Sequence, residues 1–302
     1  MKICIVQTRP GIGDLCIFLP YIHFISNFKN SKITLITKKR TKAKEILKYD
    51  PFIEKVIYID EKKKLGKIDI LKILKKNNFD EIYIMQFGFK FFFLSILANI
   101  KKIYSYGFFK NKVSISEYIN EKIRQWLSLS KIEYNCKIYL NNNSYDNSKN
   151  IIIGIGASGL NKKWPITNYV YLVKKLNLIY ENSKFIIAGG IEEKKDANYI
   201  SENCLDINLE SLCDLSIGET LQKISRSQFY IGNDTGFMHL CASLNTLSFG
   251  LFGDTPTNYV DYNKIIFPII PKGKKFITHN DKAMHLITVD HVIDEINKNF
   301  KH

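Results

Sequence analysis

The chain has 302 residues, which is long for a single core and enough for two domains of ordinary size. Hydrophobic residues make up 45% of it and charged residues 24%, a composition that excludes a disordered or fibrous protein. The net charge of +15 comes almost wholly from Lys, and the sequence has no zinc-finger spacing, RNP motif or basic-region heptads. A nucleic-acid partner is therefore not expected, whereas a surface for anionic lipid and a simple coding bias both fit the charge.

The N-terminal residues lead directly into a predicted strand, residues 2–7, without the features of a signal peptide. The six cysteines are scattered and lack the close pairs of a metal site. We therefore expect reduced core thiols and a cytoplasmic protein.

Short apolar runs alternate with amphipathic segments through the first half of the chain. Strands are predicted at residues 3–6, 33–37, 56–59, 82–85 and 102–106, and helices at 15–28, 42–48 and 67–76. This alternation predicts a parallel sheet with helices on its faces. The loop 10–14 joins the first strand to the first long helix, and ligands bind at such strand ends.

The stretch 82–100 is apolar enough to imitate a membrane span, but Gln86, Gly88, Lys90 and Asn99 interrupt it. We interpret it as a buried strand followed by an aromatic-rich helix. Core packing is the favoured role of its phenylalanines. Contact with a bilayer surface is the alternative, because Lys90, Lys101 and Lys102 are close in sequence.

Residues 140–149 lack apolar periodicity and are rich in turn formers, so we interpret them as a linker. Beyond it, strands are predicted at 151–155, 184–188, 228–231 and 247–251. A last amphipathic helix is predicted at 289–300, with Thr288 as its cap. The sequence thus predicts two α/β domains, residues 1–146 and 147–302.

Three loops at strand ends carry the candidate chemistry. The first contains Gly13 and Asp14, where the carboxylate could take a proton from a hydroxyl or could simply cap the helix. The second, residues 154–159, is rich in glycine and leads to Lys162 and Lys163. A phosphate contact and a solvated lysine pair are both open for these two side chains.

The third loop, residues 230–240, places a Gly-Asn-Asp-Thr-Gly turn between a strand and a helix. A helix N-terminus offers unpaired N–H groups and a positive dipole end, so a diphosphate can bind there. Gly232 and Gly236 would let the main chain approach the ligand, and Asp234 or Thr235 could cap the helix. His239 could contact a nucleotide or be a satisfied, partly buried histidine.

Taken in this order, the three loops resemble those of glycosyltransferase family 9, the lipopolysaccharide heptosyltransferases of the GT-B fold. The resemblance covers nearly the whole chain, and its further matching segments are Pro20 and residues 51–56, 103–107, 162–165, 251–253 and 284–293. It implies two Rossmann-like domains facing each other across a cleft, with the acceptor bound by the first and the nucleotide sugar by the second. It also allows the terminal helix to pack back on the first domain.

The resemblance implies an inverting transfer without metal or cofactor, by default of heptose from ADP-heptose to a lipopolysaccharide core hydroxyl at the inner membrane surface. Asp14 would be the base, and Lys162 would contact the donor phosphates. The ribose would be bound by Glu192 or Glu193, between which the sequence does not choose. The expected donor-binding residues are Gly13, Ala157, Ser158, Glu192, Asp234, Thr235, Gly236, Met238 and His239.

The chain departs from the family at residues 157–160, Ala-Ser-Gly-Leu, where relatives often carry Thr or Ser and Arg. Donor contacts there are expected to differ. The alternatives are a GT-B transferase for another nucleotide sugar or a protein acceptor, and a nucleotide-sugar-binding protein without turnover.

Overall fold

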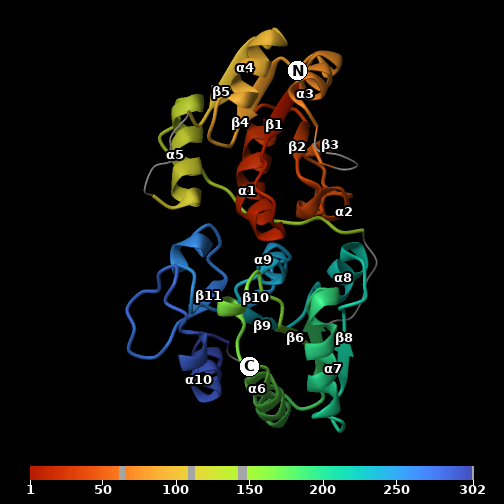
Figure 1. Ribbon diagram of the computed structural model, residues 1–302, viewed down its shortest axis with the longest axis vertical. Coiled ribbons are helices and arrows are strands. Elements are labelled where there is room, and N and C mark those ends of the chain that lie inside the picture. The colour runs from red at the N-terminus through yellow and green to blue at the C-terminus, as the bar shows by residue number, and fades with distance from the viewer. Residues whose placement is uncertain (61–64, 108–112, 142–147, 301–302) are drawn as a thin grey trace. The chain divides into compact units, whose positions relative to one another are not determined.

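The computed structural model describes residues 1–60, 65–107, 113–141 and 148–300 (Figure 1). The chain forms two compact units, Met1–Asn141 and Asn142–His302. Each unit is a parallel sheet with helices, so the two α/β domains predicted from the apolar rhythm are confirmed. The predicted boundary between residues 146 and 147 lies outside the described residues.

The first unit contains a five-stranded parallel sheet in the order β3-β2-β1-β4-β5. Its strands are β1 (Ile3–Val6), β2 (Ile33–Thr37), β3 (Ile53–Tyr58), β4 (Glu81–Ile84) and β5 (Lys102–Ser105). Its helices are α1 (Ile12–Phe28), α2 (Ala43–Ile46), α3 (Lys67–Asn77), α4 (Lys90–Leu97) and α5 (Ile115–Leu127).

The direction of the connections in this sheet reverses between β1 and β4. The chain leaves β1 toward β2 on one side and leaves β4 toward β5 on the other. Loops that diverge in this way open a crevice at the carboxyl ends of the strands. The side chains of Thr8 and Gln86 are hydrogen-bonded there, and α1 begins at the same place.

The aromatic stretch after β4 divides between two environments. Phe91 and Leu94 of α4 share a core with Ile70 and Leu74 of α3. Phe93, in contrast, is 53% exposed. The prediction of core packing is therefore correct for Phe91 and not for Phe93. Among the described helices, none is long and apolar enough to cross a bilayer.

The second unit contains a six-stranded parallel sheet in the order β11-β10-β9-β6-β7-β8. Its strands are β6 (Asn150–Gly154), β7 (Lys184–Ala188), β8 (Leu209–Ser211), β9 (Phe229–Asn233), β10 (Leu247–Leu251) and β11 (Ile266–Ile269). Its helices are α6 (Ile166–Ile179), α7 (Lys194–Glu202), α8 (Ile217–Ile224), α9 (Gly236–Ser243) and α10 (Val289–Asn299). The connections diverge between β6 and β9, so the loops that follow these two strands meet at one crevice.

The terminal helix α10 belongs to the second unit. Thr288 caps it by accepting the His291 N–H, as predicted. Val292 and Ile296 are fully buried in the core that α6 also lines. The sequence allows this helix to return to the first domain, but its apolar face is taken up by the core of its own unit.

All six cysteines are buried, in agreement with core thiols.

Candidate functional site

Asp14 lies in the first turn of α1, at the crevice of the first unit. Its Oδ2 accepts the Gly11 N–H at 3.0 Å, so it caps the helix. Its Oδ1 accepts a hydrogen bond from Arg9 Nε at 2.5 Å. The carboxylate is thus held from two sides, with its side chain still 19% exposed. The cap interpretation describes its local role, and Gly13 precedes it in the same turn.

Arg9 was not singled out by sequence reasoning. The only sequence signal was an arginine in the loop after the first strand, five residues before the acid. The ion pair appears once the loop between β1 and α1 brings the two side chains together.

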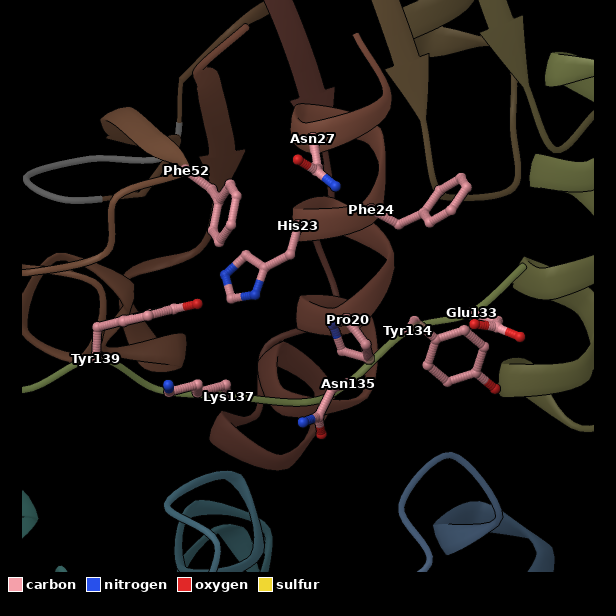
Figure 2. A pocket seen from close by; sticks show the side chains of 10 residues that line it. All are labelled: Pro20, His23, Phe24, Asn27, Phe52, Glu133, Tyr134, Asn135, Lys137 and Tyr139. Carbon is pink, nitrogen blue, oxygen red and sulfur yellow. The ribbon is translucent and has the colours of Figure 1, made fainter. Parts of the chain in front are cut away.

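A pocket of about 270 Å³ lies farther along α1 (Figure 2). His23 lines it, and His23 Nε2 is 2.7 Å from Asp50 Oδ2 in a buried contact. The rings of Phe52 and Tyr139 lie against His23, at centroid distances of 4.8 and 5.9 Å. The remaining lining residues mix apolar with hydrogen-bonding side chains: Pro20, Phe24, Asn27, Glu133, Tyr134, Asn135 and Lys137.

In the second unit, Asn233 joins the loops after β6 and β9. It is fully buried at the end of β9. Its Nδ2 donates to the carbonyl oxygens of Ile155 and Gly156 at 3.0 and 3.1 Å, and its Oδ1 accepts the Trp164 N–H at 3.1 Å. One side chain therefore fixes the glycine-rich loop relative to the segment that carries the two lysines.

Two glycines of the site are required by strand packing. Gly154 and Gly232 are partners in the register of β6 and β9. A Cβ on Gly154 would lie 1.9 Å from Tyr230 Oη, and one on Gly232 would lie 2.1 Å from the Gly154 carbonyl oxygen. Close packing of the strands thus requires Gly232, and the expectation that it admits a ligand stays a prediction.

The N-terminus of α9 has Thr235 as its N-cap residue, and the cap makes no side-chain hydrogen bond to the helix. Thr235 thus occupies the expected cap position, but its side chain does not make the capping hydrogen bond. The carboxylate of Asp234 contacts two other side chains: its Oδ2 is 3.4 Å from Lys162 Nζ, and its Oδ1 is 3.7 Å from His239 Nε2. The first N–H groups of α9 carry the positive end of the helix dipole and lack a capping side chain.

His239 links Asp234 to the core beneath it. Its side chain is almost fully buried, and its Nδ1 is 2.7 Å from Tyr262 Oη. Burial alone would raise the pKa of Asp234, but the hydrogen bond and charge of His239 and the charge of Lys162 outweigh burial and hold the pKa below its usual value. Asp234 is therefore held as a carboxylate that contacts both Lys162 and His239.

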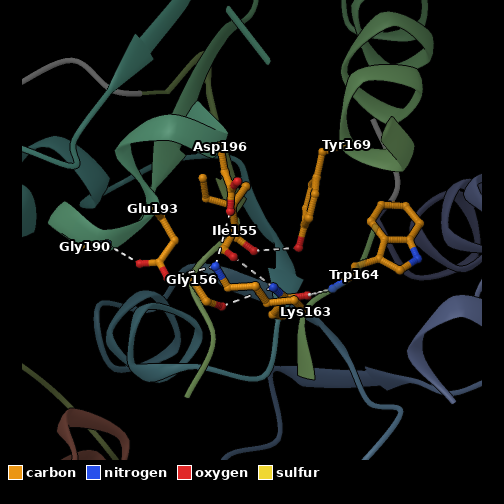
Figure 3. A network of polar contacts seen from close by, with 10 residues as sticks. Ile155, Gly156, Lys163, Trp164, Tyr169, Gly190, Glu193 and Asp196 are labelled. Atoms are coloured by element: carbon orange, nitrogen blue, oxygen red, sulfur yellow. Dashed lines mark hydrogen bonds and ion pairs between the residues drawn. The ribbon is translucent and has the colours of Figure 1, made fainter. Parts of the chain in front are cut away.

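Lys162 and Lys163 have different environments. Lys163 Nζ is 3.3 Å from Glu193 Oε1 and 3.2 Å from Asp196 Oδ2 (Figure 3). Burial lowers its pKa, but these two carboxylates outweigh burial and raise it. A solvated lysine pair is therefore wrong for Lys163. Lys162 instead contacts Asp234.

The two acidic candidates for the ribose are also separated. Glu193 is buried, accepts the Gly190 N–H through Oε2 at 3.0 Å and pairs with Lys163. Glu192 is exposed in the same short 3₁₀ helix, Ile191–Glu193. Glu193 is thus committed to internal contacts.

The remaining expected residues divide between a cavity and the core. Ser158 and Lys162 line a cavity of about 370 Å³ together with Asp254, and Ala157 is the preceding loop residue. Met238 is fully buried against β10, where a Cβ on Gly250 would lie 2.4 Å from its Sδ. Met238 lies in the first turn of α9, so its backbone is near the helix start while its side chain is in the core. Within the described ranges, no group of three His, Cys, Asp or Glu side chains could hold a metal.

Comparisons with known proteins point to one family. Residues 116–285 match the family model of glycosyltransferase family 9 (heptosyltransferase). Lipopolysaccharide heptosyltransferase 1 of Campylobacter coli is 26% identical, over 94% of this chain and 93% of its own length.

Solved structures show the same fold. A glycosyl transferase family 9 protein from Veillonella parvula matches with a TM-score of 0.82 at 15% identity, covering 99% of this chain and 97% of that one. E. coli heptosyltransferase WaaC with ADP matches with a TM-score of 0.78 at 17% identity, covering 99% of this chain and all of that one. The chain therefore has the GT-B fold, built from two Rossmann-like units.

Proposed function

Because the chain belongs to glycosyltransferase family 9 and is therefore a glycosyltransferase, we propose that it transfers heptose from ADP-heptose to a hydroxyl of the lipopolysaccharide core. The relative from Campylobacter coli, named as a lipopolysaccharide heptosyltransferase, supports the acceptor. The E. coli structure with ADP-2-deoxy-2-fluoro heptose, which has a TM-score of 0.77 to this chain, supports the donor.

The observation that carries the proposal is the start of α9. Its N–H groups have no capping side chain, and the ammonium of Lys162 lies beside it. The diphosphate of a nucleotide sugar would accept hydrogen bonds from these N–H groups and charge stabilisation from Lys162. Asp234 holds Lys162 and His239 in place, because it contacts both. Exposed Glu192 is the proposed ribose ligand, since Glu193 is already engaged.

Asp14 is the proposed base. A carboxylate has about four lone-pair sites, and Arg9 and Gly11 use two of them, so a hydroxyl can still donate to Asp14. In the proposed step the acceptor oxygen attacks the anomeric carbon while its proton passes to Asp14. The bond between that carbon and the diphosphate breaks, and ADP leaves with the electron pair, which inverts the configuration. We propose that α9 and Lys162 offset the leaving charge without a metal ion.

The partners implied are a water-soluble nucleotide sugar and a lipid-linked acceptor. We therefore place the reaction in the cytoplasm at the inner face of the inner membrane, with the protein bound peripherally.

The test measures sugar transfer from ADP-heptose and from UDP- and GDP-sugars. The melting temperature of the protein is measured with each donor as well. We expect turnover and thermal stabilisation with ADP-heptose. Consumption of a UDP- or GDP-sugar instead would support a different donor. Stabilisation without turnover would indicate a binding protein, and no response to any donor would refute the enzyme proposal.

A further inference from the structure

The helix α4 is apolar on two faces. Phe91 and Leu94 point into the core of the first unit. Phe93, Ile96 and Leu97 are spaced by three and one residues, which places them together on the other face, and they are 53%, 48% and 59% exposed. An exposed cluster of large apolar side chains on a folded protein marks a contact surface.

The neighbouring helix α3 presents a basic face. Ile68, Lys72, Lys75 and Lys76 follow the spacing of one helical face, and all four are exposed. The opposite face of α3 contributes Ile70 and Leu74 to the same core as Phe91 and Leu94 of α4. Both helices bury their inner faces in one core on one side of the sheet (Figure 1). Their exposed faces therefore lie on the outer surface of that same side.

The charge on this surface has one sign. Between them, α3 and α4 contain one acidic residue, Asp69, and its Oδ2 accepts the Gly66 N–H at 3.0 Å. The exposed faces thus combine three lysines with four large apolar side chains. This combination is complementary to an anionic bilayer, whose phosphates attract lysines and whose interface accepts Phe, Ile and Leu.

We propose that the outer face of α3 and α4 binds the first unit to an anionic membrane surface. Phe93, Ile96 and Leu97 enter the interface, and Lys72, Lys75 and Lys76 contact the lipid phosphates. The proposal deepens the proposed function, because a lipid-linked acceptor would be met at that surface. It involves none of the residues assigned to sugar transfer.

The experiment is sedimentation of the full chain with vesicles of phosphatidylcholine, with and without phosphatidylglycerol, in the absence of donor and acceptor. We expect binding that requires phosphatidylglycerol and weakens as salt is raised. The variant Phe93→Glu/Leu97→Glu should bind at least about tenfold more weakly, since it places two charges in the interface. Lys72→Gln/Lys75→Gln/Lys76→Gln should lose most of the dependence on phosphatidylglycerol.

The matched control is Tyr171→Glu/Leu178→Glu on α6 of the second unit, which adds the same charge at side chains that are 62% and 79% exposed. It should bind within about twofold of the unchanged chain if the surface is specific. Equal loss in the control would overturn the assigned surface, as would full binding by the α4 variant. An unchanged chain that ignores vesicles but forms a dimer, which the α4 variant dissociates, would make this face a contact between copies instead. Because no sugar is present, a failure of heptose transfer leaves this result unaffected.

Discussion

Asp14 and Asp69 hold the same position in two helices. Each is the third residue after a glycine N-cap, and each accepts that glycine's N–H at 3.0 Å. Only Asp14 also pairs with Arg9 and lies at the crevice of the first sheet. Comparing the two acids therefore tests the proposed catalytic role of Asp14 separately from its capping role.

We predict that Asp14→Asn lowers kcat by about 10²- to 10⁴-fold, which is the range for loss of a general base. Its melting temperature should fall only slightly, because the amide oxygen can still accept the Gly11 N–H. Steady-state kinetics with ADP-heptose and thermal unfolding measure the two effects. Asp69→Asn is the control: it alters the same cap without an arginine partner, so its stability should fall no more than that of Asp14→Asn, and its turnover should stay intact. Equal turnover in both variants would leave Asp14 as a cap only.

Lys162 and Lys163 offer a second matched pair. We predict that Lys162→Ala lowers kcat by about 10²-fold, because the proposed role of the lost charge is to stabilise the leaving diphosphate. Its effect on folding should be small, because Asp234 keeps its contact with His239. Lys163→Ala should instead reduce stability by about 1 to 3 kcal/mol, since it leaves the buried Glu193 carboxylate without its cation. Urea unfolding and kcat of both variants decide the matter. A stability loss confined to Lys162→Ala would contradict the assignment.

At the scale of elements, Asn233 connects the end of β9 to two other segments of the second unit. We predict that Asn233→Ala costs about 3 kcal/mol or more, because three buried backbone groups lose their partner. Asn233→Asp should also destabilise, since a carboxylate cannot donate to the carbonyls of Ile155 and Gly156. Urea unfolding measures both variants, and ADP affinity should fall with them. An Asn233→Asp variant with unchanged stability would show that the two carbonyl contacts contribute little.

The central strands could be predicted from sequence because they are buried on both faces and appear as apolar runs. The strands β8 and β11 were missed, and both lie at sheet edges. β8 has three residues, one of them Glu210, and β11 contains Pro268, so neither gives a continuous apolar signal. Their pairing depends on neighbouring strands rather than on their own composition.

The loops of the candidate site were also predictable, because strand ends and helix starts carry local signals in glycine, aspartate and threonine. The contacts within the site were not. Lys162 meets Asp234 from 72 residues away, and Lys163 meets Asp196 from 33 residues away. Adjacent lysines with the same local sequence thus acquire different partners only through the sheet topology. The same holds for the start of α9, which has no side-chain cap hydrogen bond. Asp234, one of the two expected caps, contacts Lys162 and His239 there.

At the scale of the whole molecule, each unit contains a carboxylate between two lysines. Glu81 in the first unit is 3.0 Å from the ammonium groups of both Lys29 and Lys102. Glu210 in the second unit contacts Lys184 and Lys223 at 2.5 and 2.6 Å. Burial raises the pKa of each carboxyl, but the lysines outweigh burial and bring both pKa values below the ordinary 4.5.

A lowered carboxyl pKa means that the unfolded chain binds more protons than the folded chain in acid. The stabilisation is therefore complete above about pH 5 and is lost as the pH falls through 4.5 toward the folded pKa. We predict that the urea midpoint is flat from pH 7 to about pH 5 and falls below that. Glu81→Gln should lower the urea midpoint at pH 7, because it should reduce the free energy of unfolding by on the order of 1 kcal/mol. The contact with Lys102 should contribute only a small part of this loss, because Lys102 is exposed. The difference between Glu81→Gln and the unchanged chain should shrink as the pH falls below 4.5, because Glu81 is then protonated in the unfolded chain and, at still lower pH, in the folded chain. A difference that stays constant across this range would show that the variant acts through packing and not through the charge of Glu81.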